Sequence, residues 1–223
     1  KAQYTIAGGL AHVGVGLVNG WDLLYDNNNQ KTFLFNADIV PSDTFHAQVS
    51  GSYGAEEPND DKDKRLTVDL TGAFVLDSLT LNFQGLVGSE PNSGVLDADG
   101  KPQNDTWFGF GLQPVYTVGN FALGGRLEYF NDKHGSRISS PAVFDKVSLM
   151  NFTITPAYTP TKNFQFRAEF RIDAALGAQV AGVDDKKIFN GKSTQSTVAL
   201  GAAYLCGFAE RAQGTRSSGP EES

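Results

Sequence analysis

The chain has 223 residues, enough for one domain with a sizeable core, and it carries a formal net charge of -7. This acidic balance argues against a nucleic-acid partner, which would require a basic face. The single cysteine, Cys206, excludes an internal disulfide framework and a thiolate metal cage. No segment has the roughly 18 consecutive apolar residues of a transmembrane helix. A membrane-spanning β-strand remains open, because it needs only about 9 to 11 residues with every second one apolar.

Alternation of apolar and polar residues predicts about ten strands along the chain. It is clearest in the segment 163–173, where Phe164, Phe166 and Phe170 share one face and charged residues fill the other. The first predicted strand is rich in glycine, and its apolar face slips by one residue. In chain order, the predicted strands cover 4–18, 32–39, 45–53, 65–74, 79–84, 107–118, 121–129, 146–158, 163–173 and 194–206.

One strand shows an internal change of face. In the segment 146–158 the apolar side moves from Val147 and Leu149 to Met150 and Phe152. An extra residue in a strand produces such a change, so we expect a β-bulge in this segment.

Short and long links alternate between the predicted strands. The short links cover 41–43, 77–78, 119–120 and 159–162, and the long links cover 19–30, 56–64, 89–106, 133–145 and 174–192. An up-and-down arrangement of the strands then places all long loops at one end. Short periplasmic turns and long extracellular loops are typical of outer-membrane barrels.

The direction of the apolar face separates two interpretations. A soluble up-and-down barrel, which could hold an apolar ligand, would turn this face inward. A transmembrane barrel would turn it toward lipid and enclose the polar face in water. The apolar face is rich in phenylalanine and ends near tyrosines, as an interfacial girdle would, which favours the membrane. The predicted fold is therefore all-β, an antiparallel up-and-down transmembrane β-barrel. The tyrosines are Tyr53, Tyr116, Tyr129 and Tyr158.

Charged residues on the polar faces are the candidate lining of a lumen. They could set the charge selectivity of a channel. They could equally pair with one another in a network of salt bridges that only stiffens the barrel. No catalytic residues are predicted, and the three histidines lack the spacing of metal ligands. The candidate lumen residues are Arg126, Glu128, Arg167, Glu169, Arg171, Asp173, Asp38 and Asp69.

Three stretches resemble the type-2 (OmpL-like) β-barrel porin family of bacterial outer membranes. They are Val-Asn-Gly-Trp-Asp at 18–22, Arg-Leu-Glu-Tyr-Phe-Asn-Asp at 126–132 and Arg-Ala-Glu-Phe-Arg-Ile-Asp at 167–173. The resemblance extends from about Gly14 to Tyr204. It implies an outer-membrane channel for passive diffusion of small solutes or ions, without a cofactor and without catalytic residues. The alternative is a non-conducting structural or adhesive barrel whose long loops bind an external partner.

Two further expectations concern the width of the barrel and the C-terminal end of the chain. About eight strands leave a packed interior and open channels appear near 16 to 18 strands, so ten strands alone would enclose a narrow lumen. Permeation would need additional strands, as in the C-terminal part of a larger barrel, or assembly with other chains. The expected partners are therefore a lipid bilayer, small solutes or ions, and further copies of the chain. We assign residues 1–206 to the barrel and 207–223 to a disordered polar tail.

Overall fold

A computed structural model describes residues 2–6, 10–20, 25–93, 96–97, 99–138, 146–180, 183–184 and 188–204. The predicted tail 207–223, Cys206 and the Trp21-Asp22 part of the first family-like stretch lie outside these residues. The described residues form one antiparallel sheet of twelve strands, of which β11 has only two residues. No helix among them is long and apolar enough to cross a membrane.

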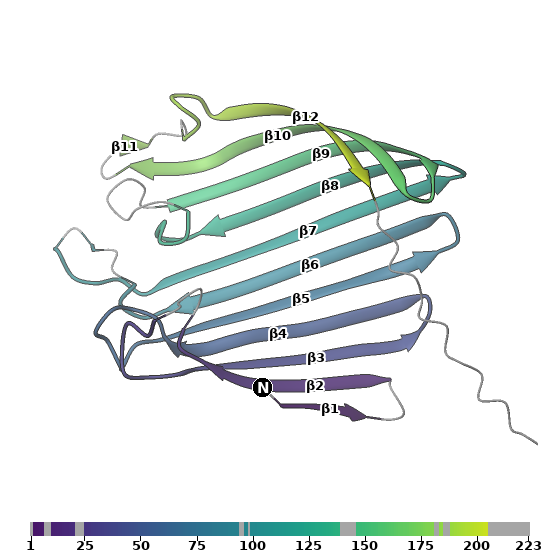
Figure 1. The fold of residues 1–223 in the computed structure, drawn as a ribbon. Helices are drawn as coiled ribbons and strands as arrows, with labels where there is room; N and C mark the ends of the chain where they lie inside the picture. Colours follow the sequence, from purple (N-terminus) through teal and green to yellow (C-terminus); the bar gives the residue numbers. More distant parts are fainter. Residues whose placement is uncertain are drawn as a thin grey trace, which may run out of the picture.

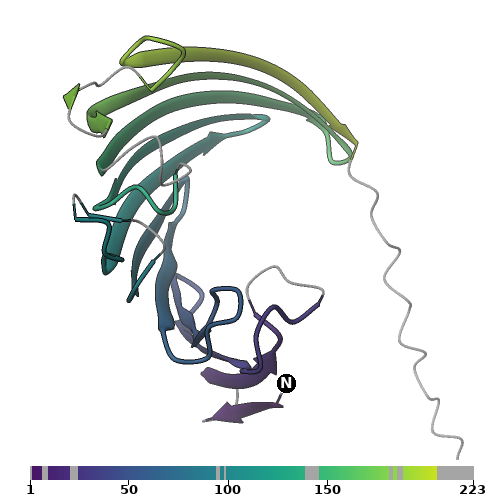
Figure 2. The ribbon, with the colours of Figure 1, turned by 90° about the vertical axis from the view of Figure 1, so that its left-hand side faces the viewer.

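The strands follow one another across the sheet in chain order up to β10, and β12 also pairs with β10 (Figure 1). Seen along the strands, the sheet is a curved wall that stays open between β1 and β12 (Figure 2). The fold class is therefore confirmed as an up-and-down β-barrel wall, here with unclosed edges. The strands are β1 (Ala2–Ile6), β2 (Ala11–Val18), β3 (Thr32–Ser42), β4 (Phe45–Ala55), β5 (Lys64–Leu76), β6 (Leu79–Glu90), β7 (Asp105–Val118), β8 (Phe121–Asp132), β9 (Lys146–Thr161), β10 (Phe164–Val180), β11 (Val183–Asp184) and β12 (Thr194–Tyr204).

Strand β7 shows how the sequence pattern becomes two different surfaces. Phe108, Phe110 and Leu112 are 45%, 53% and 44% exposed on one face, whereas Trp107 on the other face is only 5% exposed. Because successive residues of a strand point to opposite faces, the whole sheet has an apolar convex side and a more polar concave side. A soluble barrel would bury the apolar side, so this arrangement agrees with the membrane interpretation.

The two ends of the wall differ as the link lengths predict. Two-residue turns join β5 to β6 and β7 to β8, and all long loops lie at the opposite end (Figure 1). Gly119 opens the turn between β7 and β8 with a φ of 55°, a conformation that glycine adopts without strain. Exposed tyrosines mark both ends of the convex face, with Tyr53 near the loops and Tyr116 and Tyr158 near the turns.

Two predictions about strand boundaries are wrong. The segment predicted as one strand, 4–18, is two strands, because β1 and β2 pair with each other as a hairpin. The sheet therefore has eleven long strands where the sequence predicted about ten. The link predicted over 174–192 is also too long, since β10 continues to Val180.

The predicted bulge exists on the neighbouring strand. Pairing between β8 and β9 is continuous through residues 147–158. The pairing of β9 with β10 has two register shifts. At the first, Ala175 pairs with Leu149 and Gly177 pairs with Ser148, which leaves Leu176 as an extra residue of β10. The second lies beyond the predicted segment, where residues 159–160 of β9 oppose Gln165 alone. Regular pairing of β9 places Val147 and Leu149 on the concave side, and Val147 is fully buried there.

Arginine placed on the convex face should reveal which side meets lipid. In Leu112→Arg, the charge enters the middle of β7, where a lipid-facing position near the bilayer midplane costs about 2–4 kcal/mol. The neighbouring variant Gln113→Arg places the same side chain on the concave face and should cost less than about 1 kcal/mol. Urea unfolding of the protein reconstituted in lipid vesicles measures both free energies. Equal losses in the two variants would contradict the assignment of faces.

Candidate functional site: the concave wall

A row of polar residues crosses the whole concave side. Its members come from eleven different strands and are direct neighbours in the register of every pair. One member is a glycine and the others carry hydroxyl, imidazole, amide or carboxylate groups. From β1 to β12, the polar row is Thr5, His12, Asp38, Gln48, Thr71, Gln84, Gly111, Glu128, Asn151, Asp173 and Gln195.

Hydrogen bonds join neighbouring members of the polar row near its two ends. The imidazole Nδ1 of His12 lies 3.0 Å from the hydroxyl of Thr5, and the amide of Gln48 donates to Asp38. At the other end of the wall, Asp173 accepts from Asn151 at 2.7 Å and from Gln195 at 3.0 Å. Such amide and carboxylate groups exchange hydrogen bonds readily with water or solutes, so this surface suits contact with water.

All eight candidate lumen residues belong to the concave side, but they divide into two groups. On β8 and β10, each of two carboxylates has an arginine two residues away. Arg171 contacts Asp173 at 2.7 Å, and Arg126 lies 3.7 Å from Glu128. Arg167 lies over Gly201, its register partner on β12. Glu169 completes this group and faces Ala199 in the register.

The second group consists of two aspartates on the opposite part of the wall. Asp38 on β3 accepts from the amides of Gln48 and Asn36, and Asp69 on β5 accepts from Gln84 at 2.7 Å. None of the salt bridges found among the described residues includes either aspartate. These two carboxylates are therefore held by neutral donors, in contrast to those on β8 and β10.

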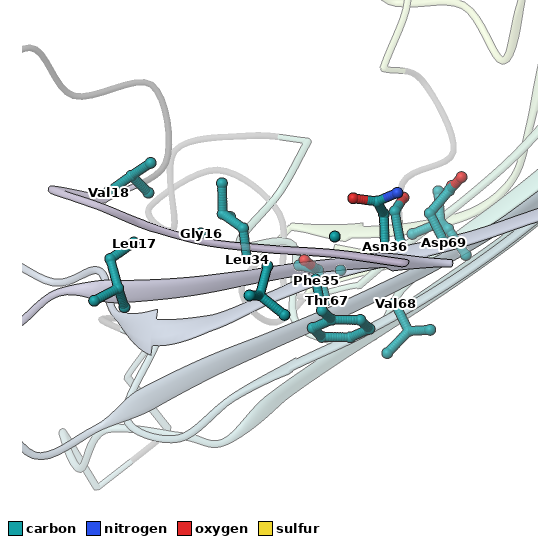
Figure 3. A pocket seen from close by; sticks show the side chains of 14 residues that line it. Gly16, Leu17, Val18, Leu34, Phe35, Asn36, Thr67, Val68 and Asp69 are labelled. Carbon is teal, nitrogen blue, oxygen red and sulfur yellow. The ribbon is translucent and has the colours of Figure 1, made fainter. Parts of the chain in front are cut away.

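A cavity of about 550 Å³ lies beside Asp69. Asn36 and Asp69 point to one side of the sheet, while Phe35 and Val68 point to the other (Figure 3). The inward-facing lining combines polar and apolar groups. These are Val18, Leu34, Asn36, Ser50, Thr67, Asp69 and Leu86.

A buried ionic cluster at the loop end was not predicted from the sequence. Glu90, the last residue of β6, has a side chain only 1% exposed and lies 2.6 Å from both Arg65 and Arg137. Arg137 also lies over the ring of Trp107 at 4.7 Å, and Trp107 itself covers Gly88, where a side chain would collide with it. Charged residues at strand ends, next to long loops, were the available sequence signal.

Two further buried carboxylates hold the start of the β8–β9 loop. Asp105 accepts from the backbone N–H of His134 at 3.0 Å and of Ser136 at 3.2 Å. Asp132 accepts from the N–H groups of Gly135, Arg137 and Ile138 at 2.7–3.1 Å. Both aspartates are fully buried, so these bonds satisfy them and fix the loop against the rim of the wall.

Two other loops are tied to each other over the concave side (Figure 2). Asn28, before β3, donates from its side chain to the carbonyl of Ala55 at 3.1 Å. Asn29 donates from its backbone to Asp61 at 2.8 Å, and Asn59 donates to the carbonyl of Asn27 at 3.0 Å. These contacts therefore narrow the opening at the loop end of the wall. Among the described residues, no three His, Cys, Asp or Glu side chains are grouped to hold a metal ion.

Removal of the central charge of the ionic cluster should destabilise the protein strongly. Glu90→Gln leaves Arg65 and Arg137 without their shared carboxylate, and breaking a buried ion pair from one side costs roughly 3–5 kcal/mol. In the matched variant Glu128→Gln, only the partly exposed pair with Arg126 is lost, for less than about 1 kcal/mol. Urea unfolding followed by tryptophan fluorescence gives both values. A comparable loss of unfolding free energy in the two variants would contradict the role of Glu90 at the centre of a buried cluster.

Glu57, in the β4–β5 loop, should make stability depend on pH. Burial and the nearby negative charge of Glu90 raise its pKa above the ordinary 4.5, against the opposing effect of Arg65. In the window above pH 4.5, the folded protein therefore binds this proton more strongly than the unfolded chain. The contribution of Glu57 to folding stability is therefore present at lower pH, and it is lost as the pH rises through the pKa of the folded state.

The variant Glu57→Gln should remove this pH-dependent contribution to stability. We expect the free energy of unfolding to fall less between pH 4.5 and pH 7 in the variant than in the wild type. Parallel urea titrations at the two pH values test this difference, and an unchanged or steeper fall in the variant would be the contrary result.

Comparison with known proteins agrees with this architecture. The family described as "Putative beta-barrel porin-2, OmpL-like" matches residues 1–206. No curated protein matches the sequence. Two solved structures share the fold. OmpT (in-vitro folded), an outer membrane protein of Vibrio cholerae, aligns with a TM-score of 0.57 and 13% identity over 91% of this chain and 62% of its own. A porin refined at 1.8 Å resolution aligns with a TM-score of 0.60 and 10% identity over 91% of this chain and 60% of its own.

The chain thus spans about three-fifths of each of these two proteins. Their low identities show a shared fold, whereas the family match extends over nearly the whole chain. The chain belongs to the OmpL-like family of β-barrel porins and is a protein of the bacterial outer membrane.

Proposed function

We propose that this chain forms the wall of a channel for passive diffusion of small solutes or ions. The observation that carries the proposal is the polar row, which crosses all eleven long strands on the concave side. A continuous polar stripe on the concave side, opposite an apolar convex side, suits a wall that encloses water and faces lipid. The shared fold with a porin supports the same function.

The open edges define what a working pore requires. Backbone groups exposed to lipid at β1 and β12 would each lose a hydrogen bond, so membrane barrels close completely. We propose that further strands close this wall, either from the same polypeptide or from a neighbouring copy. With eleven long strands in the described part, closure by several more gives a lumen wide enough for water.

The charges on the wall favour cations. The eight candidate lumen residues include five carboxylates and three arginines, so their sum is negative. Rings of charge in a pore bias which ions pass, and an acidic excess attracts cations. Pairing on β8 and β10 weakens this bias, which leaves Asp38 and Asp69 as its main source.

The adhesive alternative depends on loops that project toward a partner. Here residues 27–29 before β3 are bonded to residues 55–61 before β5 over the concave side, and residues 134–138 after β8 are held at the rim. Loops held in this way are better placed to narrow the entrance of a channel than to present a binding surface to an external partner. This arrangement supports the channel over the adhesive barrel.

Cysteine labelling of the full chain in lipid vesicles tests the channel directly. In a Cys206→Ser background, Thr71→Cys places a thiol in the polar row and Leu70→Cys places one on the convex face. A membrane-impermeant methanethiosulfonate reagent should modify Thr71→Cys and lower the conductance or solute flux, because the adduct narrows a water-filled lumen. Leu70→Cys should stay unmodified in lipid. Modification of Leu70→Cys alone, or flux unaffected by full labelling at position 71, would reject the proposal.

A further inference from the structure

We infer that the cavity beside Asp69 is a binding site for small organic cations that carry an apolar group, such as aromatic or alkyl ammonium compounds. This inference rests on the proposed function, since it names the class of solute that the wall would retain. It combines three observations: a hollow, an unneutralised charge at its edge and an apolar surface next to that charge.

The hollow has the size and composition of a ligand site. Its volume of about 550 Å³ falls in the range of small-molecule pockets, and its inward-facing lining sets three apolar side chains, Val18, Leu34 and Leu86, beside polar ones. Gly16 adds no side chain to the wall, whereas the side chain of Asn36 fills the space over Gly14. Leu34 and Leu86 provide the apolar contact, whereas Ser50 and Thr67 offer hydroxyl groups.

Asp69 gives the cavity its charge. It lies between Ser50 of β4 and Leu86 of β6 in the register, and it accepts a hydrogen bond only from the neutral amide of Gln84 among the described residues. Asp38 stands one row away and is likewise bound by amides. No arginine or lysine of the described wall forms a salt bridge with either of them.

The other carboxylates of the wall provide an internal comparison. Glu128 and Asp173 already have Arg126 and Arg171 beside them, so a solute cation gains little there. At Asp69, an ammonium group would be the first positive charge to approach. In a partly enclosed site of lowered dielectric, this attraction exceeds its value in bulk water.

The second hollow on the same wall, about 430 Å³, continues the site toward the turn end. Asp38, Gln48, Thr71 and Gln84 contribute to its lining, and it is much more polar than the first. A cation therefore binds with its charged group near Asp69 and Asp38 and its apolar part over Leu34 and Leu86.

Binding to the purified full chain in dodecyl maltoside tests the site without any need for conduction. The probes are benzyltrimethylammonium, tetramethylammonium, which lacks the apolar part, and benzyl sulfonate, which reverses the charge. Calorimetry or ligand-observed NMR should give the tightest binding for benzyltrimethylammonium and none for the sulfonate. Raising the salt from 0.1 M to 1 M should weaken binding, because it shortens the screening length from about 10 Å to about 3 Å.

Variants locate the site on the wall. Asp69→Asn should raise the dissociation constant of benzyltrimethylammonium about tenfold, as loss of a charged partner predicts. Ser50→Lys, which neutralises Asp69 from the neighbouring strand without removing it, should have the same effect. Leu86→Asn should weaken benzyltrimethylammonium and leave tetramethylammonium unchanged. The matched control Glu128→Gln should leave binding of both cations unchanged, because its carboxylate already has Arg126.

The outcomes separate this site from the channel itself. Equal binding of the sulfonate, or unchanged affinity in both Asp69→Asn and Ser50→Lys, overturns the inference even if the protein conducts. Binding that follows the variants as stated supports the site, even if the labelling experiment at Thr71 finds no flux and the channel is abandoned.

Discussion

The structure depends on the strict alternation of side chains along each strand, because one face must suit lipid and the other water. A single-residue slip would exchange the two faces, so every strand of the wall has to keep the same phase. The convex side meets this condition with phenylalanine, leucine and valine, and the concave side meets it with the polar row. In β10 the extra residue Leu176 takes up one register shift, and two further shifts lie near the turn ends of β3 and β9.

Much of the wall was predictable because this alternation is local. Faces, tight turns and the loop-bearing end all followed from residue order, and seven of the ten predicted strands need only longer ends. The division of 4–18 into β1 and β2 was missed, because the many glycines of the segment blur the alternation and hide the turn signal of the Gly-Gly pair at 8–9. The bulge appeared in the pattern of β9, but pairing with β10 decides which strand carries the extra residue.

The site was predictable only in part, since its partners are distant in the sequence. Arg171 and Asp173 lie two residues apart, so their contact follows from a strand alone. The junction of Arg65, Glu90 and Arg137 joins residues up to 72 positions apart and requires the curvature of the wall and the fold of a loop. The different surroundings of Asp69 and Asp173 also come from the register, because each is flanked by whatever the adjacent strands place beside it.

The polar row runs at right angles to the strands, and this has a consequence for a closed barrel. Strands of such barrels are inclined at about 35–45° to the axis. A line perpendicular to them therefore climbs around the wall as a spiral track and does not form a level hoop. A travelling solute would meet the groups from Thr5 to Gln195 at successive depths, so it could exchange one polar neighbour for the next in small steps.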